Sequence, residues 1–136
     1  MEERFILFKA AGEGFALNLQ EVGEVMEPPA SFPVPRAPRH FTGLINFHGA
    51  LTALVDLALY LGSESRAVVG KVLVIDPRLA HLALSVDGVN SIVTRDAIIE
   101  VSPGEDALTE SLLHTEIGRY RLLRLESLLS DLEQGF

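Results

Sequence analysis

The feature that most constrains the fold is the shortness of the apolar runs, because Gly, Pro or Asp interrupts each one after a few residues. Short runs rich in β-branched and aromatic residues, bounded by turn residues, indicate strands more than helices. We expect strands at residues 5–10, 15–19, 43–47, 50–55, 71–75, 80–86, 89–95, 98–101, 112–117 and 119–125. Many short strands with few helices predict a mainly β protein of the barrel type.

Glycines mark the turns that join neighbouring strands. The expected turns lie at residues 12–14, 48–49, 87–88 and 118. Each of them separates two strand-like runs, which predicts three β-hairpins and a hairpin-type turn at 87–88. We expect Gly49 and Gly88 to adopt the positive φ angle that such turns need.

Prolines and leucines delimit the remaining segments. Five prolines between residues 28 and 38 predict an extended surface loop, because proline cannot donate a hydrogen bond to a strand ladder. One helical turn followed by a strand is expected after Leu19. Asp56 is placed to cap a short helix at 57–61, and a leucine stripe predicts a C-terminal helix at 126–133 that packs on the body.

The charge balance is acidic, with 11 Lys and Arg against 19 Asp and Glu and a net charge of −8. Nucleic-acid-binding proteins contact phosphates with basic residues, so we expect no nucleic-acid partner. The longest apolar segment, 50–61, is too short to span a bilayer and contains Asp56, and the acidic N-terminus is unlike a signal peptide. We therefore expect a soluble, cytoplasmic protein with no direct membrane insertion.

The residue types that carry catalysis and metal binding are dispersed. Cysteine is absent, and the four histidines, at 40, 48, 81 and 114, lack the spacing of metal ligands. Ser102 and Ser111 lie outside any nucleophile motif and have no evident histidine partner in the sequence. We expect no catalytic residues, no metal and no cofactor, and hence a protein that is not an enzyme.

Several motifs resemble the CheW family and follow one another in the family's order. Residues 35–49 contain Pro-Arg-Ala-Pro and then Gly-Leu-Ile-Asn-Phe-His-Gly, and Val-Asp-Leu follows at 55–57. The family typically has Pro-x-Ala-Pro, Gly-Val-Ile-Asn-Leu-Arg-Gly and Val-Asp-Leu-Arg at these places. The segments at 22–25, 84–89 and 122–126 resemble further family motifs. The resemblance covers nearly the whole chain.

This resemblance implies a single domain over residues 1–136, built from two intertwined five-stranded SH3-like β-barrels with short helices. One subdomain is expected at about 15–65. The other is expected at 66–125 together with the N-terminal strand, with the C-terminal helix at 126–133.

The same resemblance implies a non-enzymatic adaptor of bacterial chemotaxis signal transduction. CheW-like domains bind the regulatory domain of the CheA-type histidine kinase and the cytoplasmic tip of methyl-accepting chemoreceptors. A protein of this kind is cytoplasmic and is recruited to membrane-associated chemoreceptor arrays.

A receptor-binding surface is implied at the positions that match family motifs, namely Glu24, Asn46, His48 and Gly49. Glu24 and His48 are expected to lie near each other across two strands. His48 stands where the family usually has Arg, which keeps its charge at neutral pH, and Ala58 and Arg124 also depart from the family pattern.

The kinase contact implied by the resemblance lies on edge strands of both subdomains. Such a contact should be apolar at its centre and low in charge. Leu44 and Phe47 are the expected outward-facing kinase-binding residues, whereas Ile45 and Val55 are expected in the core.

Two other functions remain open at this point. The first is a CheW-like domain of a divergent chemosensory pathway that binds the kinase but not a typical receptor. The second is a small-ligand-binding β-barrel or an unrecognised hydrolase, which a deep polar pocket with converging histidine and carboxylate groups would reveal.

Overall fold

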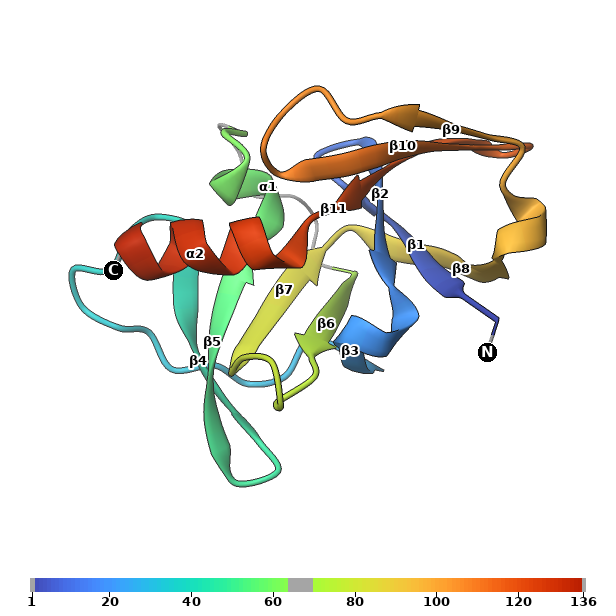
Figure 1. The fold of residues 1–136 in the computed structure, drawn as a ribbon. Helices are drawn as coiled ribbons and strands as arrows, with labels where there is room; N and C mark the ends of the chain where they lie inside the picture. The colour runs from blue at the N-terminus through green and yellow to red at the C-terminus, as the bar shows by residue number, and fades with distance from the viewer. Residues whose placement is uncertain (1, 64–69, 136) are drawn as a thin grey trace.

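The computed structural model describes residues 2–63 and 70–135 (Figure 1). The strands are β1 (Arg4–Ala10), β2 (Glu13–Asn18), β3 (Val22–Met26), β4 (Phe41–Phe47), β5 (Ala50–Asp56), β6 (Lys71–Ile75), β7 (Leu82–Val86), β8 (Gly88–Thr94), β9 (Glu100–Pro103), β10 (Thr109–Thr115) and β11 (Gly118–Leu123). The helices are α1 (Leu57–Tyr60) and α2 (Leu125–Gly135), with 3-10 turns η1 (Leu19–Glu21) and η2 (Arg95–Ala97). None of the helices in the described residues is long and apolar enough to cross a membrane.

The strands form two sheets. The five-stranded sheet has the order β3-β6-β7-β5-β4, and the six-stranded sheet has the order β8-β1-β2-β11-β10-β9. Most neighbours are antiparallel, but β5 pairs with β7 and β2 pairs with β11 in parallel. The expected mainly β fold with two sheets is confirmed, and one of the sheets has six strands instead of five.

The two sheets take their strands from interleaved parts of the chain. Strands between residues 22 and 86 build the five-stranded sheet, whereas strands at 4–18 and 88–123 build the six-stranded sheet. The sheets thus divide the chain at other positions than the expected subdomain bounds of 15–65 and 66–125. The boundary at 65–66 itself lies outside the described residues.

The three expected hairpins are present as the antiparallel pairs β1–β2, β4–β5 and β10–β11. The first turn lies at Ala11 and Gly12, which have positive φ angles, slightly before its expected place. Gly49 has the expected positive φ, at 86°, and Gly118 has a φ of 137°. Local sequence therefore predicted these pairings well, because a tight turn fixes the register of the strands beside it.

The turn expected at Asp87 and Gly88 is wrong as a hairpin. β7 pairs with β5 and β6 in one sheet, whereas β8 pairs with β1 in the other. The Asp87 N–H donates to the carbonyl of Lys9 at 2.8 Å, and Gly88 is not among the glycines with positive φ. The chain crosses between sheets here because β1 offers β8 a long edge, a partner that no local pattern encodes.

Local hydrogen bonds set the start of α1 and the start of β9, and both elements lie close to their expected positions. The Asp56 side chain accepts a hydrogen bond from the N–H of Leu59 at 3.1 Å, so the expected cap of α1 is confirmed. The strand expected at 98–101 begins later, as β9, because the N–H of Ile98 bonds to the carbonyl of Arg95 and closes η2.

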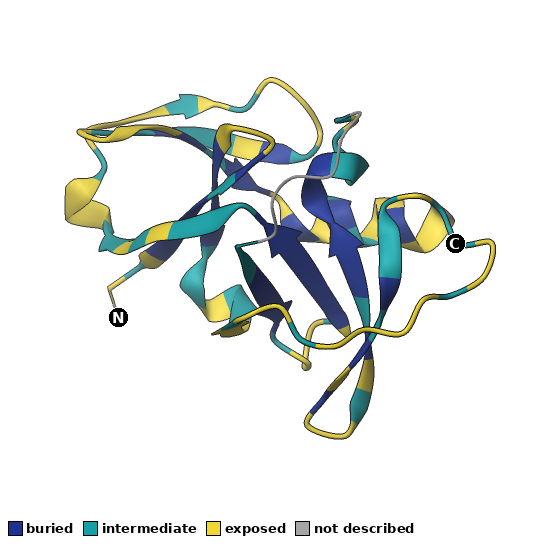
Figure 2. Ribbon diagram, turned by 180° about the vertical axis from the view of Figure 1, so that it is seen from behind, coloured by how far each residue is buried: buried dark blue, intermediate teal, exposed yellow. Residues whose placement is uncertain are grey.

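The main core lies between the two sheets and against α2. Phe8 and Phe15 of the six-stranded sheet, Leu73 and Leu84 of the five-stranded sheet, and Leu128 of α2 belong to one buried cluster. Figure 2 shows this buried centre, with the exposed residues at the strand ends and in the loops. The amphipathic face of α2 thus covers the junction of the sheets, as its leucine stripe predicts.

A polar contact also holds α2 in place. The Tyr60 hydroxyl of α1 donates a hydrogen bond to the Asp131 carboxylate of α2. Burial, and then the hydrogen bond to Asp131, raise the pKa of Tyr60 well above its usual value. The hydroxyl therefore stays protonated and keeps donating at any ordinary pH.

We predict opposite outcomes for alanine at two glycines. Gly49→Ala should lower the free energy of unfolding by about 1–2 kcal/mol, because alanine disfavours the left-handed conformation that Gly49 adopts. Gly88→Ala is the matched control, since an added Cβ there meets no atom within 4 Å and the φ is not positive. It should leave stability unchanged or raise it by up to about 1 kcal/mol. Urea denaturation of both variants measures the difference, and equal losses would contradict the turn geometry.

Candidate protein-interaction site

The tip of the β4–β5 hairpin carries three of the residues expected to bind a receptor, and it projects away from the body (Figure 1). His48 and Gly49 form the turn, with φ angles of 49° and 86°. The Asn46 side-chain oxygen accepts a hydrogen bond from the N–H of Gly49 at 2.8 Å. Asn46 therefore holds the turn together and leaves the His48 ring exposed above it.

Glu24 comes to the hairpin tip from β3, at the opposite end of the strand order. Its Oε1 lies 3.8 Å from Nε2 of His48, so the expected proximity of the two side chains is confirmed. The five-stranded sheet must curve strongly to bring its edge strands this close. The exposed fractions of the side chains are 43% for Glu24 and 75% for His48, so water screens the pair and it adds little to stability.

This pair places an acidic side chain and an imidazole ring together at the tip. Glu24 is a carboxylate, whereas His48 carries charge only when its ring is protonated. The ring also lies edge-on to Phe47, with the ring centroids 4.3 Å apart. The tip can therefore present an acidic side chain, an imidazole ring and backbone groups of the turn to a partner protein.

The expected kinase-binding residues have different environments. Leu44 is half-buried, but Phe47 is buried in a cluster inside the five-stranded sheet, so its expected outward orientation is wrong. The reason is the two-residue period of a strand, which puts residues three apart on opposite faces. Phe47 shares its face with Ile45, and the expected burial of Ile45 and Val55 is confirmed.

A second apolar surface, missed by sequence reasoning, lies on the six-stranded sheet. Ile92 and Val101 are exposed on the two edge strands, β8 and β9. Ile99 and Ile117 are also exposed and line a hollow of about 310 Å³ at one end of the sheet. Ile92 and Val101 are exposed because β8 and β9 are edge strands, whereas Ile99 precedes β9 and Ile117 lies in the turn between β10 and β11.

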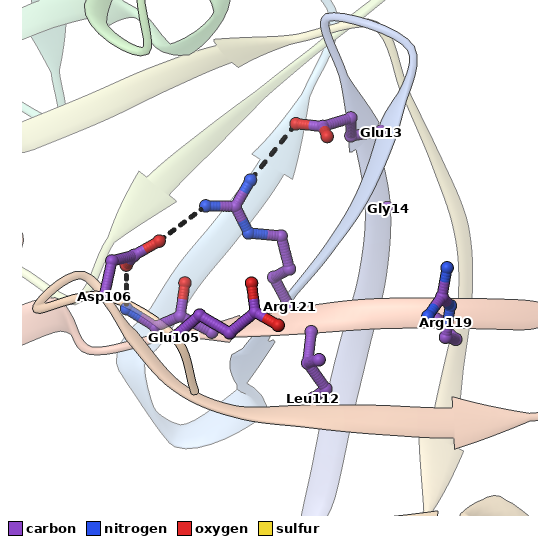
Figure 3. A pocket seen from close by; sticks show the side chains of 8 residues that line it. Glu13, Gly14, Glu105, Asp106, Leu112, Arg119 and Arg121 are labelled. Carbon is purple, nitrogen blue, oxygen red and sulfur yellow. Dashed lines mark hydrogen bonds and ion pairs between the residues drawn. The ribbon is translucent and has the colours of Figure 1, made fainter. Parts of the chain in front are cut away.

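A hollow of about 550 Å³ is lined by charged side chains (Figure 3). Arg121 lies between Glu13, at 3.1 Å, and Asp106, at 3.0 Å, and its guanidinium also lies over the Phe15 ring. Partial burial opposes ionisation of Asp106, but hydrogen bonds from Thr109 and Leu108, with Arg121, lower its pKa overall. The two ion pairs of Arg121 neutralise these charges and connect the loop before β10 to the start of β2.

One histidine does have a serine partner, contrary to the expectation from sequence. Ser102 Oγ lies 2.9 Å from Nε2 of His114 on the neighbouring strand. No described carboxylate is hydrogen-bonded to His114, and a catalytic triad needs such a group to orient the imidazole. The described residues also hold no cluster of three or more potential metal-binding side chains. In the described residues the pair is a hydrogen bond between the neighbouring strands β9 and β10.

Known proteins resemble this chain in sequence and in fold. The model of the CheW-like domain family matches residues 4–133. The probable chemotaxis protein CheW of Rhizobium etli is 27% identical over 140 residues, which covers 97% of this chain and 90% of that protein. The crystal structure of the scaffolding protein TtCheW from Thermoanaerobacter tengcongensis shares the fold, with a TM-score of 0.79 at 19% identity, covering 91% of this chain and 90% of that one. The chain therefore belongs to the CheW-like family of chemotaxis scaffold and adaptor proteins.

Proposed function

We propose that this chain is a non-enzymatic adaptor that couples chemoreceptors to a CheA-type histidine kinase in bacterial chemotaxis. The observation that carries the proposal is the exposed Glu24–His48 pair at the hairpin tip. It combines residues of two separate CheW-like motifs into one surface. The protein acts in the cytoplasm and joins membrane-associated arrays through the cytoplasmic tip of the receptor.

The receptor-binding surface in this proposal is the hairpin tip. Glu24 and His48 provide the polar side chains that a receptor meets. Asn46 and Gly49 act by fixing the turn that presents His48, since the Asn46 oxygen bonds to the Gly49 N–H. A partner therefore meets a preformed turn, which reduces the ordering entropy that binding costs.

The kinase-binding surface in this proposal uses both sheets. Leu44 supplies an apolar side chain on the outer face of β4, and Phe47 supports the same hairpin from inside. On the six-stranded sheet, the hollow lined by Ile99 and Ile117 supplies the second apolar contact. Separate pull-downs with a kinase regulatory domain and a receptor tip fragment test the proposal, and binding of neither protein would contradict it.

One observation favours a second candidate function within the same family. Arginine, the usual residue at this position, is always charged, whereas histidine is not. His48 lies beside Glu24 on the exposed tip. A divergent pathway, in which the chain binds the kinase but not a typical receptor, is the alternative that this substitution supports. The His48→Arg variant separates the two candidates.

His48→Arg should strengthen binding to a typical receptor tip at neutral pH without changing kinase binding. Arginine keeps its charge and offers a planar fork for carboxylates. An exposed ion pair contributes about 0.2–1 kcal/mol, so the expected gain in affinity is about 1.4- to 5-fold. The control is His81→Arg, which adds the same group at another exposed histidine. Isothermal titration calorimetry measures both, and equal effects of the two variants would contradict the role of His48.

Leu44→Glu and Phe47→Glu should fail in different ways. Leu44→Glu should weaken kinase binding about tenfold or more, as loss of an interface anchor does, with a nearly unchanged melting temperature. Phe47→Glu should unfold the protein, because it buries a carboxylate in an apolar cluster. Thermal denaturation and kinase binding by biolayer interferometry distinguish the cases. Loss of folding in Leu44→Glu would assign that residue to the core.

A further inference from the structure

One face of β9, β10 and β11 carries mostly polar side chains that the proposed function does not use. Directly opposite residues of antiparallel strands point to the same side of a sheet. Leu112 of β10 is opposite Arg121 of β11 and Ser102 of β9. His114 follows Leu112 on the same side and is opposite Arg119. We call these five residues the polar strand face.

The hollow of about 550 Å³ lies on this face, and small-molecule sites typically have volumes of about 300–1,000 Å³ (Figure 3). Its floor is rigid because β2 and β11 approach closely. A Cβ on Gly14 would lie only 2.7 Å from the carbonyl oxygen of Arg119, so the two backbones meet without a side chain between them. The floor of the hollow is therefore preformed, which lowers the ordering entropy that binding a ligand costs.

The ion pairs of the hollow leave one acidic and one basic side chain over. Arg121 contacts Glu13 at 3.1 Å and Asp106 at 3.0 Å. Glu105 and Arg119 also line the hollow, and neither makes an ion pair with any described residue. Both side chains are exposed, so a ligand can reach them.

These two side chains lie on either side of an apolar one. Figure 3 shows Glu105 on the loop before β10 and Arg119 on β11, with Leu112 between them. A ligand that bridges them needs an acidic group for Arg119, a basic group for Glu105 and a short carbon chain over Leu112. Arginine suits the acidic end, because its planar fork matches both oxygens of a carboxylate.

The lining favours a ligand that carries both charges. A simple anion would meet three acidic side chains of the lining, and Arg121 is already engaged with two of them. A simple cation would be repelled by Arg119 and leave it without a partner. We infer that the hollow binds a small zwitterionic amino carboxylate, with its carboxylate at Arg119 and its ammonium group at Glu105.

Three further charged side chains lie near the hollow, but none of them lines it. Glu100 is on β9 and is separated from Arg119 by β10. The Lys9 Nζ lies over the Tyr120 ring, 5.5 Å from its centroid, and Glu110 lines a different hollow. The site lies on the six-stranded sheet, whereas the hairpin tip belongs to the other sheet, so the inference does not depend on the proposed function.

The test is a titration of the full chain, followed through its backbone amide signals by NMR at neutral pH and constant ionic strength. The zwitterionic probes are free glycine, β-alanine and γ-aminobutyrate, in which the distance between the charges increases. Butyrate and butylamine are the matched controls, because each has a short carbon chain and only one charged group. We expect at least one zwitterion to shift the signals of β10, β11 and the loop before β10, and to bind more tightly than either control. Since water screens both contacts, the dissociation constant should be in the millimolar range.

Two pairs of variants test the assigned contacts. Arg119→Gln and Glu105→Gln should each weaken binding of the best zwitterion about two- to fivefold, which is the contribution of one exposed ion pair. Arg4→Gln and Glu133→Gln are the controls at an exposed arginine of β1 and an exposed glutamate of α2, and they should behave like the parent protein. Arg119→Lys keeps the charge and should retain most of the binding. The melting temperature checks that each variant is folded.

Several results would overturn the inference. If no zwitterion shifts the signals of the hollow more than butyrate and butylamine do, the hollow does not recognise paired charges. Unchanged affinity in both Arg119→Gln and Glu105→Gln would show that binding does not use these groups. Shifts confined to other parts of the chain, or an equal loss of binding in the control variants, would assign the ligand to another place. No kinase or receptor fragment takes part in these titrations, so each outcome leaves the proposed function as it stands.

Discussion

The rest of the structure depends on one shared apolar core between two sheets. Phe15 of β2 and Leu84 of β7 lie in different sheets but in the same buried cluster, and Leu128 of α2 completes it. Neither sheet can bury this surface alone, because each supplies only one wall of it. The two sheets are therefore expected to fold together as one cooperative unit, with the interaction surfaces held on its outside.

This arrangement decides which surfaces form the core and which stay exposed. Because the inner walls of the sheets are used for folding, the proposed function places recognition on strand edges, hairpin tips and outer faces. Glu24 reaches the hairpin tip only because β3 and β4 are the two edges of one curved sheet. Ile99 and Ile117 are exposed because they lie where the six-stranded sheet ends. Sites of this kind need no pocket, since rigid strands already hold their side chains in place.

The sequence pattern predicted the turns and helix caps that depend only on neighbouring residues. The turn at His48 and Gly49 and the cap at Asp56 depend on residues a few positions apart, so the sequence shows them. The crossing at Asp87 depends on β1, some 78 residues earlier at Lys9, and no turn signal records that partner. The prediction that Phe47 faces outward was wrong for a simpler reason. The two-residue period of a strand puts Phe47 and Leu44 on opposite faces of β4.

The candidate site was predictable to the extent that family resemblance supplied long-range information. The proximity of Glu24 and His48 comes from two motifs whose spacing in the sequence says nothing about distance in space. The contact between Ser102 and His114 had no such guide, because it depends on the register of β9 against β10.

The parallel pairing of β2 with β11 has a consequence for synthesis on the ribosome. Phe15 emerges early, but its strand partner Arg121 and the covering leucines of α2 emerge more than a hundred residues later. Until β11 and α2 are synthesised, the apolar face around β2 stays exposed in the nascent chain. Chaperones bind exposed apolar surface of this kind. A chain that stops before residue 118 lacks both β11 and α2, so its apolar core stays exposed and we expect cellular quality control to remove it.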